Sequence, residues 1–102
     1  MNLTGRPIYQ KAGKPVKDRA HLLRVKSLPC IICNAPPPSD AHHCISDRYG
    51  TRKVGDDETI PLCKRHHQEG PNAIHNGKAS WEARHGKDYE YLPRVKSMLD
   101  VM

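Results

Sequence analysis

Two pairs of metal-binding residue types constrain this sequence more than any other feature. Cys30 and Cys33 are separated by two residues, and Cys63 and His66 have the same spacing. Zinc prefers four tetrahedral nitrogen and sulfur ligands. A tight turn can point both members of one pair inward, and residues three apart share one face in the first turn of a helix. The spacing therefore predicts a structural Zn2+ site with three cysteines and one histidine.

The chain offers little apolar material for a large core. It has 102 residues, an apolar fraction of 36%, no Phe and one Trp. A structural zinc ion contributes roughly 10–16 kcal/mol of apparent binding free energy when folding brings its ligands together. We therefore expect one small domain stabilised by metal. Cys44 has no partner at short spacing, so we expect it in the core.

The cysteines have alternative interpretations. In a secreted protein they would form disulfides, and buried cysteines can also be inert packing residues. The first twenty residues contain no apolar run of the signal-peptide kind, and no segment approaches the roughly 20 apolar residues that span a membrane. We therefore expect a cytoplasmic protein with reduced thiols and no membrane association.

Positive charge is concentrated near the N-terminus. Of the 17 Lys and Arg residues, seven lie within the first 28 residues, where Asp18 is the acidic residue, and the other ten are balanced by ten Asp and Glu. Cations beside a polyanion gain free energy by releasing condensed counterions. Residues 1–16 are therefore interpreted as a basic flexible arm that contacts DNA phosphates, or else as a solvated tail. The seven cations are Arg6, Lys11, Lys14, Lys17, Arg19, Arg24 and Lys26.

Proline, glycine and capping residues predict an α+β domain. Asp18 can cap a helix that Pro29 ends, and the prolines at 36–38 form a stiff connector that excludes a helix. Gly70 and Pro71 interrupt a helix that begins near Cys63. We expect strands at 40–46 and 59–62, and helices at 18–28, from 63 to the interruption, at 78–85 and at 92–101.

Histidines supply a second set of candidate ligands. A zinc ion bound to Cys63 and His66 would bring the next residue, His67, opposite the doublet His42-His43. His75 lies eight residues after His67, which on an unbroken helix would separate them by about 12 Å. A bend at 70–71 would return His75 to the group, with Pro71 opening a new turn.

The pattern formed by these residues resembles the HNH, or ββα-metal, endonucleases. It comprises the Cys-x2-Cys pair, DAHHC at 40–44, ETIPLCKRHH at 58–67 and Ile-His at 74–75. The likeness spans about 28–86 and is strongest to small phage-borne members and to the RecA-dependent nuclease of the Ref type. It implies a zinc-stapled, treble-clef-like ββα-metal domain with flanking helices over 17–102. It also implies DNA as the substrate, a phage or prophage origin in a bacterial host, and a possible recombinase or packaging partner.

The resemblance assigns a role to each candidate. It implies that His43 is the general base, that His42, His67 and His75 hold one catalytic divalent ion, and that Cys30, Cys33, Cys63 and His66 hold the structural zinc. The family's middle Asn falls near Glu58, so an acidic residue, Glu58 or Asp57, replaces it. All-nitrogen ligation suits Zn, Mn, Ni or Co better than Mg. Phosphate contacts, or simply solvated cations, are expected at Arg48, Arg52, Lys53 and Arg65.

The expected function is metal-dependent hydrolysis of DNA phosphodiester bonds. Imidazole titrates near 6.5, so His43 can accept a proton from water at neutral pH, while one divalent ion stabilises charge on the phosphate and the leaving oxygen. The alternatives are a noncatalytic zinc-stabilised nucleic-acid-binding module and a zinc-stabilised protein-interaction domain. Both need only the Cys3His set and leave the other histidines without a role. If His43 is not the base, His75 and His85 are the alternatives.

Overall fold

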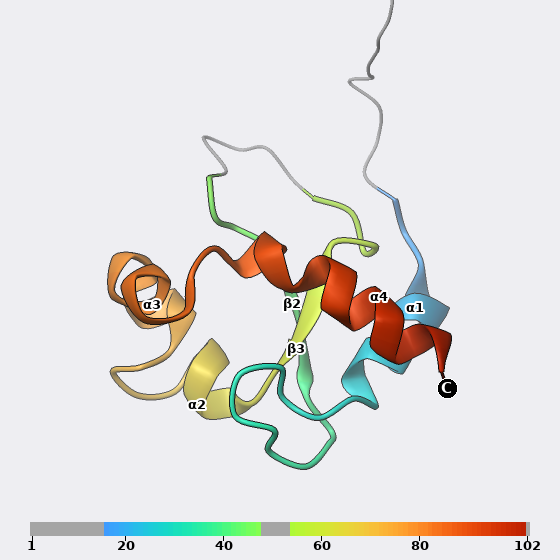
Figure 1. The fold of residues 1–102 in the computed structure, drawn as a ribbon, viewed down its shortest axis with the longest axis horizontal. Helices are drawn as coiled ribbons and strands as arrows, with labels where there is room; N and C mark the ends of the chain where they lie inside the picture. Colours follow the sequence, from blue (N-terminus) through green and yellow to red (C-terminus); the bar gives the residue numbers. More distant parts are fainter. Residues whose placement is uncertain (1–15, 48–53, 102) are drawn as a thin grey trace, which may run out of the picture.

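The computed structural model describes residues 16–47 and 54–101 and has an α+β architecture (Figure 1), which confirms the predicted class. An antiparallel two-stranded sheet lies at the centre, with helices on either side. Residues 1–15 of the predicted arm at 1–16 and the predicted phosphate contacts Arg48, Arg52 and Lys53 lie outside the described residues. The elements in chain order are α1 (Arg19–Lys26), β2 (Asp40–His43), β3 (Thr59–Leu62), α2 (Lys64–His67), η1 (Ile74–Asn76), α3 (Lys78–His85), η2 (Asp88–Tyr91) and α4 (Leu92–Asp100).

The hairpin positions the histidine doublet. Strand β2 pairs with β3 in a register that sets Asp40 opposite Leu62 and His43 opposite Thr59. All four residues of β3 are buried. Side chains alternate between the two faces of a strand. Asp40 and His42 therefore share one face of β2, and His43 points to the other.

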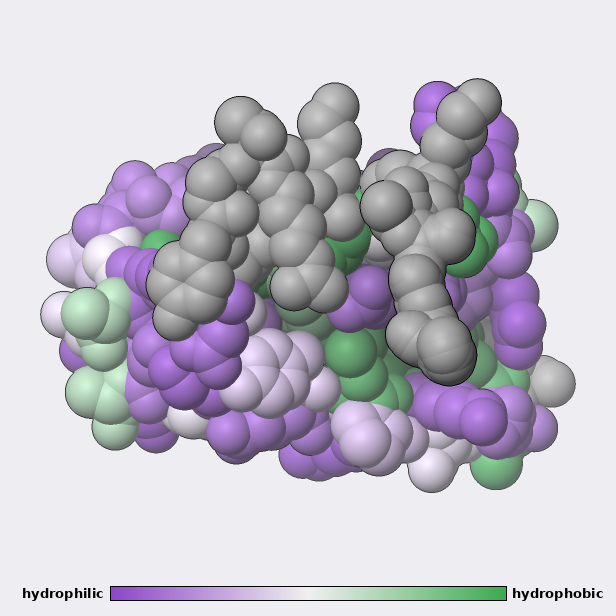
Figure 2. Space-filling model, turned by 90° about the horizontal axis from the view of Figure 1, so that it is seen from above, coloured by the Kyte–Doolittle hydropathy of each residue, from purple (hydrophilic) through white to green (hydrophobic). Residues whose placement is uncertain are grey.

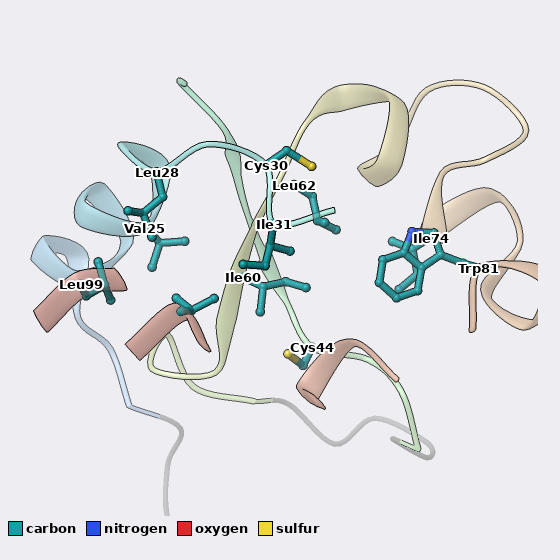
Figure 3. Close-up of a cluster of buried hydrophobic side chains, with 11 residues drawn as sticks. Val25, Leu28, Cys30, Ile31, Cys44, Ile60, Leu62, Ile74, Trp81 and Leu99 are labelled. Carbon is teal, nitrogen blue, oxygen red and sulfur yellow. The ribbon is translucent and has the colours of Figure 1, made fainter. Parts of the chain in front are cut away.

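The core lies on both sides of the hairpin (Figure 3). Val25, Leu28 and Leu99 pack where α1 and α4 meet, and Ile74 and Trp81 pack on the side of α3. Figure 1 shows α4 crossing the hairpin, with α1 and α3 at opposite ends of the molecule. The space-filling view in Figure 2 shows one face on which hydrophilic residues predominate. Cys44 is 4% exposed and belongs to this core, as predicted.

Helix α1 begins where predicted and ends two residues early. The Asp18 carboxylate accepts a hydrogen bond from the His21 amide at 3.0 Å, so Asp18 is the N-cap. The helix stops at Lys26, and Leu28 instead turns into the core, where the Ser39 hydroxyl donates to its carbonyl at 2.6 Å. Arg24 on α1 donates to the Leu99 carbonyl at 2.9 Å and ties the helix to α4.

Strand β2 is shorter than the predicted range of 40–46. It ends at His43. The Cys44 amide still donates to the Glu58 carbonyl at 3.0 Å, but the two amides after it donate to a buried carboxylate instead of to β3. Asp88 accepts hydrogen bonds from the Ile45 amide at 2.6 Å and from the Ser46 amide at 3.2 Å. Strand β3 and helix α3 have the predicted bounds, and α4 ends one residue early.

Helix α2 is also shorter than predicted. It ends at His67, and the chain then turns through Gly70, whose φ of 85° lies in the left-handed region that glycine tolerates. The side-chain amide of Asn76 donates to the carbonyls of Gln68 and Gly70 at 2.9 and 2.8 Å, which closes the loop. This loop brings η1, and with it His75, back beside α2. Within the described part of the chain, no helix has the length and apolar character needed to cross a bilayer.

Candidate metal and catalytic site

The Cys-x2-Cys segment forms the predicted tight turn. The Cys30 amide donates to the Ala35 carbonyl at 3.0 Å, and the Asn34 amide donates to the Cys30 carbonyl at 2.9 Å. Asn34 has a φ of 62°, a conformation that Asn adopts more readily than most residues. The turn brings the Sγ atoms of Cys30 and Cys33 to one side.

The start of helix α2 supplies the other pair of candidate ligands, Cys63 and His66. Cys63 is its N-cap, and the amides of His66 and His67 donate to the Cys63 carbonyl at 3.1 and 2.9 Å. Cys63 and His66 therefore lie on one face of the first turn. One ligand atom from each of the four residues Cys30, Cys33, Cys63 and His66 lies within 4.8 Å of the others. The structure brings the predicted Cys3His set together.

The separations within this group fit zinc. Zn–S bonds of about 2.3 Å and Zn–N bonds of about 2.05 Å at tetrahedral angles set two sulfurs about 3.8 Å apart, and a sulfur and a nitrogen about 3.6 Å apart. The sulfurs of Cys33 and Cys63 are 3.7 Å apart. His66 Nδ1 lies 3.2 Å from the Cys63 sulfur and 3.9 Å from that of Cys30. The group could hold a metal such as zinc.

The electrostatics favour a thiolate at Cys30. Burial by itself would raise the pKa of the Cys30 thiol, but backbone N–H groups of Cys33, Cys63 and Ile32 outweigh burial and lower the pKa. The pKa of Cys33 is raised by burial and by the neighbouring thiols of Cys63 and Cys30. Several thiols packed this closely favour a cation that neutralises them. None of Cys30, Cys33 and Cys63 is in a disulfide.

A second group of ligand atoms comes from β2, α2 and η1. One ring nitrogen from each of His42, His67 and His75 lies within 4.8 Å of the others. The Nε2 atoms of His67 and His75 are 3.2 Å apart, and two nitrogens on one tetrahedral ion are expected to be about 3.3 Å apart. The ring centroids of the three residues are 4.8 to 5.2 Å apart. His42 and His67 are buried, whereas His75 is exposed, so the group opens to solvent on the His75 side.

Carboxylates fix the orientation of two of these histidines. His42 Nε2 donates to Asp88 at 2.9 Å, and His67 Nδ1 donates to Asp40 at 2.8 Å. Hydrogen bonds outweigh burial and lower the pKa of both carboxyls, so each is ionised and can only accept. The other nitrogen of each ring, Nδ1 of His42 and Nε2 of His67, therefore carries the lone pair. Metal-ligating histidines typically have such a carboxylate partner.

The surroundings of all three histidines favour the neutral form of the imidazole. Burial lowers the pKa of His42, of His67 and of His75, and the charge that a neighbouring imidazolium would carry lowers each further. A neutral imidazole can donate a lone pair to a metal without first losing a proton. The group could thus hold a metal ion through three nitrogen ligands, with one side open to solvent.

His43 has a separate environment on the opposite face of β2. Its Nε2 donates to Asp56 Oδ1 at 2.9 Å, and its side chain is 41% exposed. The hydrogen bond from His43, together with one from the Asp18 amide, lowers the pKa of Asp56. Since an ionised Asp56 only accepts, Nε2 of His43 carries the proton and Nδ1 carries the lone pair. His43 is therefore oriented as a proton acceptor.

Asp56 is the acid that contacts the His43 ring. The expectation that Glu58 or Asp57 replaces the family's Asn concerns a different role and stays a prediction. The Glu58 backbone carbonyl accepts from the Cys44 amide at 3.0 Å and continues the strand pairing. The turn that begins at Gly55 carries Asp56 back towards His43, and sequence spacing alone does not show this.

Two remaining candidates, Arg65 and His85, are not members of the histidine group. Arg65 is exposed on α2. The His85 ring packs against Trp81 with centroids 4.9 Å apart and against His66 at 5.7 Å, so His85 lies beside the Cys3His group. The choice of His43 over His85 as the base stays a prediction.

Sequence reasoning missed the three carboxylates that hold histidines. Asp40 had a detectable signal, because it lies two residues before His42 on the same strand face. Asp56 lies in an acidic loop in which the sequence does not single out one residue. Asp88 had no signal, because it is an isolated acid 46 residues from its partner His42.

Comparison with known proteins places the chain among proteins without an assigned activity. A family with the description "Protein of unknown function (DUF968)" matches residues 11–100. The "Uncharacterized protein YdfU" of Escherichia coli strain K12 is 33% identical over 72 residues, which cover 69% of this chain and 19% of that protein. The chain thus spans about a fifth of the length of that relative. No solved structure matches it. Since the family match covers nearly the whole sequence, the chain belongs to the DUF968 family.

Proposed function

We propose that this protein is a metal-dependent endonuclease of the HNH, or ββα-metal, type that hydrolyses DNA phosphodiester bonds. The observation that carries the proposal is the arrangement around β2. His42 joins His67 and His75 in a group that could hold a metal, and the adjacent His43 is oriented by Asp56 with a lone pair on Nδ1. A ligand and an oriented base on consecutive residues suit hydrolysis, because the reaction needs both charge stabilisation and a proton acceptor.

The order of elements also supports the proposal. Strands β2 and β3 form a hairpin, and α2 follows β3 directly. This is the ββα order that the resemblance implies, and β2 and α2 supply His42 and His67 of the histidine group. The Cys3His group at the start of α2 would take the structural zinc. It uses none of the three histidines of the other group, so two roles are separated in the fold.

Each residue of the site has its own role in the proposed reaction. His43 takes a proton from the attacking water through Nδ1, while Asp56 stabilises the imidazolium that forms. Asp88 and Asp40 keep the rings of His42 and His67 in the tautomers that present a lone pair. A bound divalent ion would stabilise negative charge on the phosphate and on the leaving oxygen. Three nitrogen ligands favour Zn, Mn, Ni or Co over Mg.

A plasmid-nicking assay tests the proposal. Protein whose exchangeable metal has been removed is reloaded with Zn, Mn, Ni, Co or Mg and incubated with supercoiled plasmid. We expect nicking with at least one metal, loss of nicking in His67→Ala, and normal nicking in the control His21→Ala, which removes a histidine of α1 outside both groups. Absence of cleavage with every metal, together with retained DNA binding, would replace the proposal with a noncatalytic zinc-stabilised nucleic-acid-binding module.

A further inference from the structure

Asp56 connects His43 to the segment that precedes α1. Besides the contact of Oδ1 with His43, Asp56 Oδ2 accepts a hydrogen bond from the Asp18 amide at 2.8 Å. The Asp56 amide in turn donates to the Val16 carbonyl at 2.8 Å. Each carboxylate oxygen thus has its own donor, and the backbone of Asp56 is held by the same segment. Residues 38 positions apart in sequence share this junction.

Gly55 makes the junction possible. A Cβ atom at this position would lie 2.5 Å from Asp57 Oδ1, the end of a side chain that can move, and 2.7 Å from the Val16 amide nitrogen, which is backbone. It would also lie 3.0 Å from the Val16 Cβ, so the two backbones are too close for a larger residue. The turn is also closed internally, since the Glu58 amide donates to the Gly55 carbonyl at 3.0 Å and the Thr59 hydroxyl to the Asp56 carbonyl at 2.9 Å. The loop at 55–59 can therefore pack closely against the segment 16–18.

A carboxylate with donors on both oxygens cannot rotate without losing one of them. If the segment 16–18 moved away, Oδ2 would lose the Asp18 amide, and the Asp56 side chain could turn away from His43. The ring of His43, which is partly exposed, would then be free to change its tautomer and direction. The orientation of this histidine thus depends on contacts made by residues outside the hairpin and the helices that supply the metal ligands.

We propose that the segment Val16–Asp18 is a positioning element for the general base, acting through Asp56 on His43. The effect of this segment on catalysis rests on the proposed function. It also adds to that function, because the exposed Lys17 lies between the two residues that hold Asp56. A DNA phosphate bound at Lys17 would hold the segment against Gly55, so binding of the substrate and orientation of the base are coupled.

The test uses Gly55→Ala in the full-length, zinc-loaded protein. This substitution pushes the Val16 backbone away and leaves His43, Asp56 and every proposed ligand chemically unchanged. Gly77→Ala is the matched control, because a Cβ there meets its nearest neighbour, Ser80 Cβ, at 3.9 Å. Long-range 1H–15N spectra of the imidazole rings report the tautomer of His43. Single-turnover cleavage and KM for duplex DNA report function, and zinc content reports folding.

We expect the wild type and Gly77→Ala to show His43 in the Nε2–H tautomer, and Gly55→Ala to show exchange between tautomers. The single-turnover rate of Gly55→Ala should fall about tenfold or more, since an oriented general base contributes roughly 100- to 10,000-fold. Gly55→Ala should add little to the loss caused by Asp56→Ala, because both act through one contact. If Gly55→Ala fails to retain zinc, Val16→Gly loosens the same segment and should show a smaller change in the same direction.

A wild-type tautomer and rate in a folded Gly55→Ala or Val16→Gly protein would overturn the inference. Additive losses from Gly55→Ala and Asp56→Ala would overturn it as well, because the segment would then act by another route. If the wild-type protein does not cleave DNA, the proposed function fails. The tautomer spectra then decide separately whether the segment 16–18 fixes His43.

Discussion

Replacing Asp88 with Ala should destabilise the protein severely. The Asp88 carboxylate is fully buried and accepts hydrogen bonds from His42 Nε2 and from the amides of Ile45 and Ser46. The substitution leaves these three donors without a protein partner. Each unsatisfied buried donor costs about 1–3 kcal/mol, and removing one member of a buried pair typically costs about 3–5 kcal/mol. We expect a loss of about 3–5 kcal/mol, a large part of the roughly 5–15 kcal/mol that stabilises a typical domain.

Urea unfolding at a fixed free-zinc concentration measures this loss. The control is Asp100→Ala, which removes an exposed carboxylate at the end of α4 and should change stability by less than about 0.5 kcal/mol. Asp88→Asn, which keeps one acceptor oxygen, should fall between the two. The pKa of Asp88 lies below its ordinary value, so its stabilising effect is present at neutral pH and is lost as the pH falls through that range. A loss below 1 kcal/mol for Asp88→Ala would refute the reasoning, because it would mean that water or another group satisfies the freed donors.

Three further predictions follow from the site. Asp40→Ala should weaken metal binding at the histidine group by about 10- to 100-fold, because Asp40 orients His67. The control Lys64→Ala, which removes the other partner of the same carboxylate, should leave metal binding unchanged. Equal affinities of the two variants in a metal titration would show that Asp40 does not orient His67. Metal occupancy of the histidine group should be constant from pH 8 to about 6.5 and fall only below that pH. Burial lowers the pKa of each of the three histidines, so protons compete with the metal for the ring nitrogens only in the acidic range. A midpoint of metal release above pH 7 would contradict this. Deleting residues 2–15 removes Arg6, Lys11 and Lys14 and keeps Val16, so both metals should be retained. The slope of log K for DNA binding against log salt concentration should flatten by up to roughly 2.7. An unchanged slope would identify the arm as a solvated tail.

Short-range sequence patterns predicted part of the fold. The x2 spacing of Cys30 with Cys33 and of Cys63 with His66 marks ligand pairs, and the apolar run at 59–62 marks a strand whose four residues are all buried. Helix α3 lies between Gly77 and Gly86, which are residues that end helices, so its bounds could be read directly. The first turn of α2 was likewise predicted from the position of Cys63.

What the sequence did not show depends on contacts between distant residues. Asp88 shortens β2 by taking the amides of Ile45 and Ser46, and no local pattern connects an acid at 88 with a strand at 40. The early end of α2 depends on the loop that Asn76 closes. Asp56 approaches His43 only because Gly55 lets the chain pass close to Val16. These contacts are set by packing across the hairpin, which residue types and spacing describe poorly.

The most direct test of the central claim measures metal content and DNA cleavage on the same samples of wild-type and His43→Ala protein. The base accepts a proton and binds no metal in this account, so His43→Ala should keep the metal at both groups and its affinity for DNA. Its single-turnover cleavage rate should fall by about 100-fold or more. Near-normal cleavage by a His43→Ala protein that retains both metals would contradict the assignment of the base. Loss of the exchangeable metal in this variant would show instead that His43 is a ligand.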